Sequence, residues 1–313
     1  MKIAFLFAGQ GAQKIGMGKD LTQECKSADL AFDEASEALG FDIKKIIFEG
    51  QQETLDITEN TQPAVLTMSI ACLRALQEHG IKADYAAGLS LGEYSAHVCS
   101  GTFLYPDAIK VVRQRGKFMQ EEVPIGKGAM AAILGLDEAA VLSICNEAKN
   151  AGILEPANFN CPGQIVISGE TKVVELACEI AKQKGAKRAM ILPVSAPFHC
   201  SMLTGAGEKL RGVLKETQIV CMDIPVIANV SALPTINTRK DIIETLVSQV
   251  SSSVLFEKSI HYILDQGVDT FIEIGPGKTL SGFVKKINKD ANIFNVGDVV
   301  SLHQALEGLE VLK

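Results

Sequence analysis

Apolar and polar residues alternate along this chain in a pattern that predicts short buried strands separated by longer helices. Residues 2–7 form one predicted strand, which is apolar after Lys2, and residues 85–89 form a second short apolar run. Runs this short and this apolar are typical of strands that are buried on both faces of a sheet. Helices are predicted over residues 63–77, where a proline occupies the first turn, and over residues 106–122, which end before a proline.

The segment 127–195 has a different order of predicted elements. Its strands fall at residues 129–134, 154–159, 164–168 and 187–193, and its helices at residues 137–150 and 171–184. The order βαββαβ is typical of a ferredoxin-like sheet. The sequence therefore predicts a small α+β unit inserted into the rest of the chain.

Beyond this unit, strands again alternate with helices, at residues 224–230, 270–274 and 292–296. Such alternation predicts an α/β fold with a mostly parallel sheet covered by helices. The expected limits are residues 1–125 and 196–313 for a large α/β subdomain and residues 126–195 for the small ferredoxin-like (βαββαβ) one.

Composition and charge exclude several classes of partner. The chain has 37 acidic and 30 basic residues and a formal net charge of −7, whereas nucleic-acid binding needs a dense basic surface. No apolar run approaches the ~20 residues of a membrane-spanning helix, and the N-terminal run is too short for a signal peptide. The eight cysteines form no CxxC pair, so we expect no metal site and no disulfide framework, but reduced cytoplasmic thiols.

The first candidate for chemistry is the segment Gly88-Leu89-Ser90-Leu91-Gly92, which matches G-x-S-x-G. It follows a predicted strand and precedes a helical stretch, as in a nucleophile elbow, where the serine hydroxyl is exposed at a helix N-terminus. We therefore expect an α/β-hydrolase-like core. The alternative is a strand–helix turn without chemistry, because small residues are common in such turns.

A serine nucleophile needs a base, and histidine is the usual one. The sequence has five: His79, His97, His199, His261 and His303. His97 follows Ser90 by seven residues, which places it about 10 Å along the helix axis, too far to take the serine proton. A helix-end cap explains His79, and amphipathic helices explain the two C-terminal histidines. Elimination leaves His199, in an extended segment flanked by prolines, as the candidate base.

Arg115 is the candidate residue for substrate selection. In the predicted helix 106–122 its neighbours one turn away are Val111, Phe118 and Met119, so it faces an apolar flank without a local acid. An inward guanidinium requires a carboxylate. That carboxylate comes either from elsewhere in the fold or from a ligand, and the sequence leaves both possibilities open.

Together these features resemble the malonyl-CoA:acyl carrier protein transacylases of fatty acid synthesis, an acyltransferase family. The resemblance covers nearly the whole chain. The motifs that carry it are residues 7–13 (FAGQGAQ), 88–94 (GLSLGEY), 113–120 (RQRGKFMQ), 157–164 (ANFNCPGQ) and 196–199 (APFH). Five motifs in the family's order are far more specific than G-x-S-x-G alone.

The resemblance implies a role for each candidate. Ser90 would take the malonyl group as an ester, and His199 would accept its proton and later activate the phosphopantetheine thiol. The backbone N–H groups of Gln10 and Leu91 would form the oxyanion hole, and Arg115 would hold the malonyl carboxylate. The reaction would be ping-pong, with CoA as a substrate and no cofactor.

Further substrate-binding residues are implied by the matched segments. Gln249 corresponds to a family position near the histidine, whose ring is oriented by a main-chain carbonyl. Phe198 is a bulky residue at a family position that is linked with the size of the transferred acyl group, and its bulk favours malonyl over methylmalonyl. Asn160 lies in one of the matched motifs. The chain departs from the family at Leu89, where histidine is common. This departure removes a polar neighbour of Ser90 and leaves the serine–histidine pair untouched.

A basic run on this acidic chain suggests a partner surface. It consists of Lys182, Lys184, Lys187 and Arg188. The run is either a solvated surface or a docking site for the acidic acyl carrier protein that the resemblance implies.

Three other functions fit parts of the sequence. A hydrolase with the same elbow would need an acid between Ser90 and His199, such as Asp107 or Asp137. A binding module would grip acyl-CoA without transferring the acyl group. A polyketide acyltransferase of broader specificity is a variant of the main interpretation.

Overall fold

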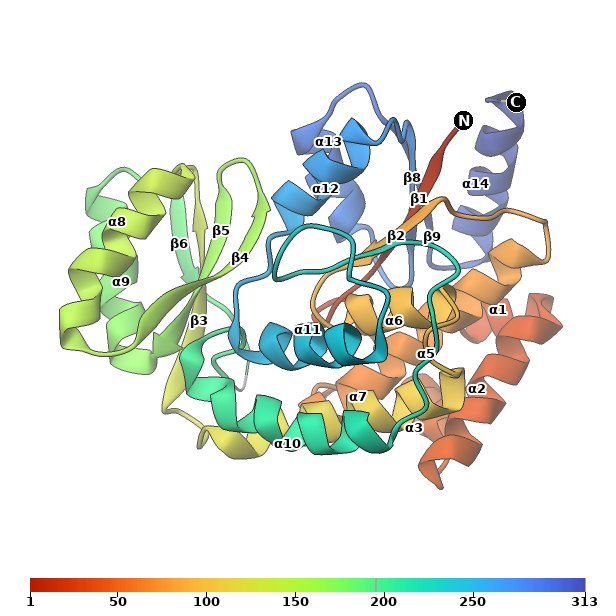
Figure 1. Ribbon diagram of the computed structural model, residues 1–313, viewed down its shortest axis with the longest axis horizontal. Helices are drawn as coiled ribbons and strands as arrows, with labels where there is room; N and C mark the ends of the chain where they lie inside the picture. Colours follow the sequence, from red (N-terminus) through yellow and green to blue (C-terminus); the bar gives the residue numbers. More distant parts are fainter. Residues whose placement is uncertain (195, 313) are drawn as a thin grey trace.

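The computed structural model describes residues 1–194 and 196–312, which form two β-sheets with their helices (Figure 1). The larger sheet contains strands from both ends of the chain, and the smaller one, at the left of Figure 1, contains the middle of the chain. The last residues of the two expected subdomains, Ser195 and Lys313, lie outside the described residues. The expected subdomain limits stay a prediction.

The large sheet is parallel, in the order β7-β2-β1-β8-β9. Its strands are β1 Ile3–Phe7, β2 Tyr85–Gly88, β7 Val226–Ile227, β8 Thr270–Ile274 and β9 Asn292–Val296. In the central strand β1, Phe5 packs with the α5 side of the core, whereas Leu6 packs with α12 and α13 on the other face. Burial on both faces explains why β1 is uniformly apolar. The predicted mostly parallel α/β core is confirmed.

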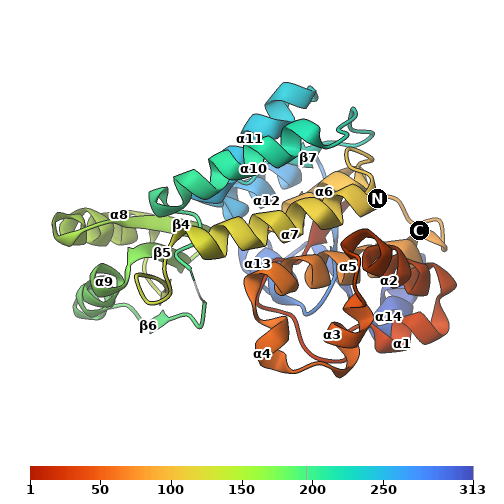
Figure 2. The ribbon, with the colours of Figure 1, turned by 90° about the horizontal axis from the view of Figure 1, so that it is seen from below.

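Helices cover both faces of this sheet. They are α1 Lys19–Glu24, α2 Lys26–Leu39, α3 Ile43–Glu49, α4 Gln52–Leu55, α5 Thr58–Gln77, α6 Gly92–Cys99, α7 Tyr105–Glu122, α10 Thr204–Glu216, α11 Arg239–Ser251, α12 Phe256–Asp265, α13 Thr279–Ile287 and α14 Val299–Val311. Helix α7 runs beside α10 along the lower side of the molecule (Figure 2). Within the described residues, no helix is both long and apolar enough to cross a membrane.

The predicted start of α5 is wrong. The helix begins at Thr58, so Pro63 lies in its interior and not in its first turn. The residues before the proline are polar and gave no apolar period, yet Thr61 and Gln62 are buried against neighbouring elements. Tertiary packing, which local periodicity does not report, buries this polar turn.

The strand expected at residues 224–230 is also largely wrong. Strand β7 contains only two residues and lies at the edge of the sheet. After it the chain turns back, with the N–H of Ala228 donating to the carbonyl of Leu233 and Ala232 at a φ of 56°. This turn ends the strand and places Asn229 beside the end of β2.

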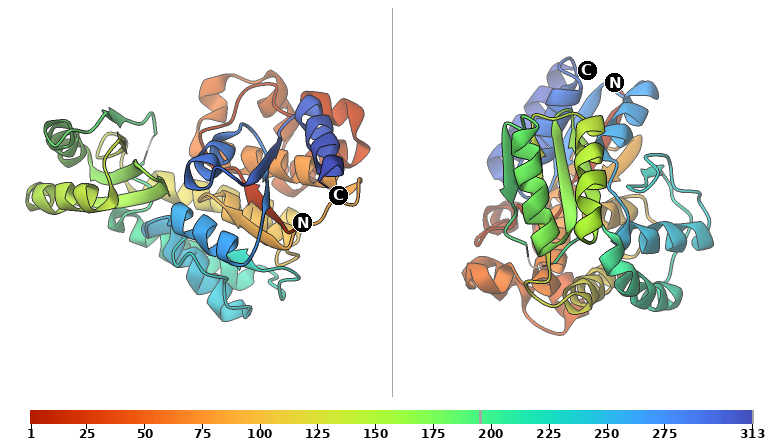
Figure 3. Two further views of the ribbon diagram at one scale, coloured as in Figure 1. Left: turned by 90° about the horizontal axis from the view of Figure 1, so that it is seen from above. Right: turned by 90° about the vertical axis from the view of Figure 1, so that its left-hand side faces the viewer.

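The small sheet is antiparallel, in the order β4-β5-β3-β6, which is the ferredoxin-like order expected for βαββαβ. Its elements are β3 Gly128–Leu134, α8 Glu138–Ala148, β4 Leu154–Cys161, β5 Gln164–Glu170, α9 Thr171–Gln183 and β6 Arg188–Ile191. Helices α8 and α9 cover its outer face (Figure 3, right). Side chains of β3 alternate: Ala131 and Ile133 pack on these helices, whereas Met130 and Ala132 face the large subdomain.

Backbone hydrogen bonds join the small sheet to a connection of the large subdomain. The N–H of Phe159 in β4 donates to the carbonyl of Val254 at 2.9 Å, and the N–H of Val254 donates to the carbonyl of Ala157 at 2.8 Å. Residue 254 lies in the connection between α11 and α12. This pairing fixes one wall of the cleft between the sheets relative to the other.

Candidate active site

Ser90 sits on a strained turn between β2 and α6. Its φ is 54°, a left-handed conformation that residues with side chains rarely adopt. The turn is tight: a Cβ on Gly88 would lie 2.0 Å from the carbonyl carbon of Gly92, and one on Gly92 would lie 2.0 Å from the carbonyl oxygen of Phe7. The backbone N–H of Ser90 donates to Asn229 Oδ1 at 2.7 Å. Glycines and an asparagine therefore hold the serine in place.

His199 is the histidine that reaches the serine. Its Nε2 lies 2.7 Å from Ser90 Oγ, and its Nδ1 lies 2.9 Å from the backbone carbonyl oxygen of Gln249. Burial, and then the charge of Arg115, lower the pKa of His199 to about 4. The ring is thus neutral at pH 7. Because a carbonyl only accepts hydrogen bonds, we assign the ring proton to Nδ1, which leaves the Nε2 lone pair facing the serine hydroxyl.

The residues considered as alternatives lie elsewhere. His97 packs edge-on against Phe103, and burial lowers its pKa to about 3. Asp137 caps α8 by accepting a hydrogen bond from the N–H of Ala140, and Asp107 lies in the first turn of α7. Among the described residues, no carboxylate accepts a hydrogen bond from the His199 ring. The acid of a serine–histidine–acid triad is therefore replaced by a main-chain carbonyl.

Arg115 reaches the same serine from α7. Its Nη1 donates to Gln62 Oε1 at 2.9 Å, and its Nη2 donates to Gln249 Oε1 at 2.9 Å and to Ser90 Oγ at 3.2 Å. The side chain is only 1% exposed, and burial lowers its pKa. Among the described residues it makes no ion pair with a carboxylate. A buried guanidinium with only neutral partners can accept a carboxylate ligand.

These groups open onto a cleft of about 810 Å³ between the two sheets. Every residue proposed from the sequence for the reaction lines it except Gln249, which lies behind Arg115. The N–H groups of Gln10 and Leu91 donate no hydrogen bond to any residue in the described part of the chain. Phe198 is 8% exposed, and Asn160 is 6% exposed with its Oδ1 lacking a partner among residues 1–194 and 196–312.

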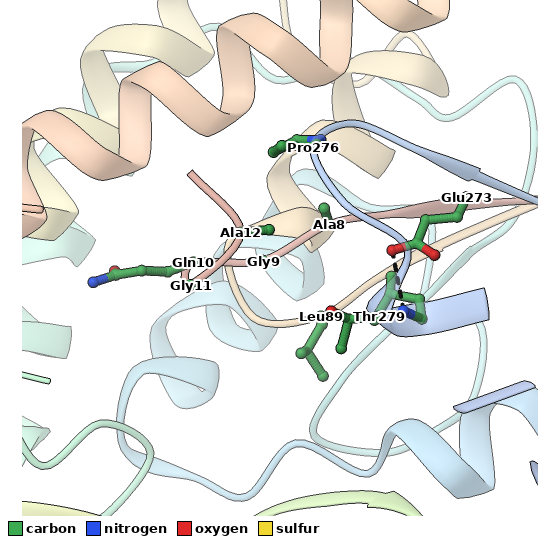
Figure 4. Close-up of a pocket in the computed structure, with 10 residues that line it drawn as sticks. Ala8, Gly9, Gln10, Gly11, Ala12, Leu89, Glu273, Pro276 and Thr279 are labelled. Carbon is green, nitrogen blue, oxygen red and sulfur yellow. Dashed lines mark hydrogen bonds between the residues drawn. The ribbon is translucent and has the colours of Figure 1, made fainter. Parts of the chain in front are cut away.

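Leu89, the departure from the family pattern, lines this cleft and a smaller neighbouring cavity of about 140 Å³ (Figure 4). The wall of the smaller cavity includes Glu273, whose carboxylate accepts hydrogen bonds from the N–H groups of Leu280 and Ser281 at 3.0 and 2.7 Å. Glu273 thereby caps α13, the helix that borders the cleft through Thr279.

Three residues that support the site, Gln62, Glu93 and Asn229, were not predicted from the sequence. Gln62 was missed because the start of α5 was misplaced. Asn229 follows β7, which pairs with β2, and the carboxyl ends of neighbouring parallel strands meet at one edge of a sheet. This rule could have predicted that Asn229 lies beside Ser90. Glu93 gave none beyond its place next to the elbow.

The basic run lies on the small subdomain, outside the cleft lining. Lys184 pairs with Glu147 at 2.8 Å, whereas Lys182, Lys187 and Arg188 are exposed. Strand β6 leads from this run directly into residues 192–194, which line the cleft. The basic run is therefore close in sequence to one wall of the cleft, without lining it.

The fold and this site are those of an acyltransferase. A serine on a tight strand–helix turn with a neutral histidine 2.7 Å from its hydroxyl is an arrangement suited to covalent acyl transfer, and a buried cation lies beside it. Comparison with known proteins gives the family. The family model described as "Acyl transferase domain" matches residues 4–308.

Curated relatives narrow the assignment. The chain is 51% identical over 310 residues to the malonyl CoA-acyl carrier protein transacylase of Bacillus subtilis, covering 99% of this chain and 98% of the relative. It is 43% identical over 308 residues to the enzyme of that name from Escherichia coli strain K12, covering 98% and 99%. The chain therefore belongs to the acyl transferase family, among the malonyl CoA-acyl carrier protein transacylases.

Solved structures agree with this family assignment. The crystal structure of the malonyl CoA-acyl carrier protein transacylase from Clostridium perfringens has a TM-score of 0.96 at 47% identity, covering 100% of this chain and 98% of that one. A malonyl-transacylase solved in complex with its type II PKS acyl-carrier protein has a TM-score of 0.95 at 41% identity, covering 98% and 99%.

Proposed function

We propose that this chain transfers the malonyl group of malonyl-CoA to the phosphopantetheine thiol of an acyl carrier protein, through a malonyl ester of Ser90. The single observation that carries the proposal is the convergence on Ser90 Oγ of a neutral His199, at 2.7 Å, and of Arg115, at 3.2 Å. The names of the relatives support the substrate and the acceptor.

In the first half-reaction, His199 Nε2 accepts the hydroxyl proton while Ser90 Oγ attacks the thioester carbonyl carbon. The negative charge moves to the carbonyl oxygen. When the C–S bond breaks, the proton on Nε2 passes to the sulfur and CoA leaves as a thiol. The malonyl group remains as an ester on the serine.

The second half-reaction runs the same steps with a different thiol. His199 Nε2 takes the proton of the phosphopantetheine thiol, and the sulfur attacks the ester carbonyl. The C–O bond to Ser90 breaks, and the proton returns to Oγ. Because one thiol leaves before the other enters, the kinetics are expected to be ping-pong.

The oxyanion of both tetrahedral intermediates is proposed to bind the N–H groups of Gln10 and Leu91. Both residues line the cleft, and neither N–H donates elsewhere in the described part of the chain. Leu91 precedes the first residue of α6, so its N–H belongs to the electropositive end of that helix.

The acyl group is proposed to be selected at its free end. Arg115 would bind the malonyl carboxylate with two N–H donors, and Gln249 would hold the guanidinium toward Ser90. An acetyl group would leave the buried guanidinium unpaired, which is costly. Phe198 would limit the size of the acyl group, and the unpartnered Oδ1 of Asn160 would accept a hydrogen bond from the substrate.

The proposed reaction needs no metal or redox cofactor, because the thioester itself supplies an activated acyl group. We also propose a cytoplasmic location. It is supported by the eight cysteines, all of which are free thiols.

The carrier protein is proposed to dock on the edge of the small subdomain, at the basic run. Next to Lys187 and Arg188, the edge strand β6 exposes Met190 (45%) and Ile191 (48%). Basic and apolar groups together suit an acidic partner with an apolar patch.

A serine hydrolase is less well supported, because the ring of His199 is oriented by a carbonyl and not by an acid.

Steady-state kinetics test the proposed transfer reaction. With both substrates varied, parallel double-reciprocal lines are expected. Intersecting lines would mean that both thiols bind together, which contradicts a covalent intermediate released from CoA before the carrier enters.

A further inference from the structure

The side-chain amide of Gln249 has an orientation that the surrounding groups dictate. Its Oε1 accepts a hydrogen bond from Arg115 Nη2 at 2.9 Å, and its Nε2 donates to the carbonyl oxygen of Ser90 and to Glu93 Oε2, both at 2.8 Å. In the flipped amide, an NH₂ group would face the guanidinium and an oxygen would face two acceptors. Hydrogen-bonding chemistry therefore permits only the observed orientation.

Glu93 is one of the two acceptors that fix this orientation, and the other is the Ser90 carbonyl. It is fully buried in the first turn of α6, and its Oε2 accepts hydrogen bonds from Gln249 Nε2 and from the backbone N–H of Asn229 at 3.0 Å. This oxygen can accept both hydrogen bonds whether the carboxyl group is ionised or carries a proton on Oε1. Glu93 makes no direct hydrogen bond to Arg115 among the described residues, so it does not compete for the substrate carboxylate.

We infer that Glu93 is a positioning residue for acyl-group selection: it locks the amide of Gln249 so that its oxygen holds Arg115 at Ser90. This inference rests on the proposed function and adds a residue that never touches the substrate. Without the acceptor at position 93, the amide of Gln249 keeps only the Ser90 carbonyl as an acceptor, so it holds Arg115 less firmly and the malonyl carboxylate is bound less well. Acetyl transfer does not use the guanidinium and keeps its rate.

The test compares two variants of nearly equal size. Glu93→Met removes the acceptor, whereas Glu93→Gln keeps a carbonyl oxygen that the two donors, Gln249 Nε2 and the N–H of Asn229, would orient toward themselves. The Oε1 of Glu93 has no partner in the described part of the chain, so the new NH₂ group displaces no existing hydrogen bond. Ser95→Ala, which removes a different buried polar group from the same helix, is the matched control.

The readout is the ratio of the Ser90 acylation rates with malonyl-CoA and acetyl-CoA, measured by intact mass. Partial unfolding lowers both rates equally and leaves this ratio unchanged. In Glu93→Met the ratio of malonyl to acetyl acylation rates is expected to fall roughly 10- to 100-fold. This is the effect expected when Arg115, a charged group, loses its hydrogen bond to Gln249. In Glu93→Gln and Ser95→Ala it should stay within about threefold of the wild type.

Two results overturn the inference. An unchanged ratio in Glu93→Met means that Glu93 does not control Arg115. An equal fall in Glu93→Gln means that the charge of Glu93, and not its position as an acceptor, matters. Failure of the wild type to form a malonyl adduct on Ser90 would instead contradict the proposed function, so the two failures are distinguishable.

Discussion

His199 Nδ1 lies 2.9 Å from the backbone carbonyl oxygen of Gln249, so a peptide group orients the ring where hydrolases with the same elbow use a carboxylate. A carbonyl fixes the tautomer without adding a negative charge that would raise the pKa of the ring. The base therefore stays neutral and weakly basic. Such a base suits a thiol leaving group, which needs less help from an acid than an alcohol or amine does.

This relationship predicts how acylation depends on pH. In the proposed mechanism His199 is a base and must be neutral, and burial with the nearby Arg115 lowers its pKa to about 4. The acylation rate should therefore not fall as pH decreases from 7.5 to about 5, and should fall only near the lowered pKa. Rapid-quench experiments with malonyl-CoA at a series of pH values measure this acylation rate.

Glu93 titrates in the same interval, because burial raises its pKa to about 7. The profile should therefore be measured in Glu93→Gln as well, where this titration is absent. A fall in rate centred near pH 6.5 in that variant would show that His199 titrates like an exposed histidine, contrary to the expectation.

Replacing Arg115 should exchange one acyl specificity for another. In Arg115→Ala, malonyl transfer should fall about 100-fold or more, because the malonyl carboxylate would be buried without its partner. Acetyl transfer should become faster than in the wild type, since no guanidinium is left unpaired. The values of kcat/KM for the two CoA esters measure both changes.

Arg113→Ala is the matched control for this prediction. Arg113 lies on the same helix, 3.7 Å from Glu59 and against the ring of Phe41, away from the cleft lining. Its removal should leave the malonyl-to-acetyl ratio unchanged. An unaltered ratio in Arg115→Ala would remove that residue from acyl selection.

The elbow should tolerate no side chain at Gly92. A Cβ there would lie 2.0 Å from the carbonyl oxygen of Phe7. That oxygen belongs to the backbone, so it cannot move aside as the end of a flexible side chain could. Gly92→Ala should lower the free energy of unfolding by about 2 kcal/mol or more and abolish acylation.

Gly212→Ala provides the contrast in urea unfolding. Gly212 is exposed in α10, and an added Cβ meets nothing within 4 Å. This substitution should raise the free energy of unfolding by about 0.5–1 kcal/mol, because it reduces the entropy of the unfolded chain. Equal effects of the two substitutions would mean that the elbow is not as tightly packed as described.

Charge reversal on the basic run should affect only the second half-reaction. In Lys187→Glu/Arg188→Glu, KM for the carrier protein should rise about tenfold at low salt, whereas Ser90 acylation by malonyl-CoA should not change. The difference from wild type should shrink as ionic strength increases. If the carrier KM is unaffected, the docking surface lies elsewhere.

Much of this site could be predicted from the sequence because its chemistry is concentrated in short segments. Ser90 is marked by its flanking glycines, and His199 by the lack of another histidine free of a structural role. The parallel core and the βαββαβ unit followed from apolar runs whose lengths report burial.

The supporting residues could not be found in this way. Gln62 contacts Arg115, Asn229 contacts Ser90, and Glu93 contacts Gln249. All three contacts join segments that are far apart in the sequence. Polar residues at helix starts and strand ends are usually solvated, so type and position alone do not separate these three from ordinary surface residues. The same limit hid the true start of α5 and the brevity of β7.

Intact-mass spectrometry of the wild type and of Ser90→Ala, after mixing with malonyl-CoA and before and after adding holo carrier protein, tests the central claim most directly. The proposed mechanism predicts one malonyl adduct on the wild type, none on the variant, and transfer of the adduct to the carrier. Release of free malonate at a rate indifferent to the carrier would contradict it in favour of a hydrolase. Absence of any adduct and of any turnover would reduce the elbow to a turn in a protein that only binds acyl-CoA.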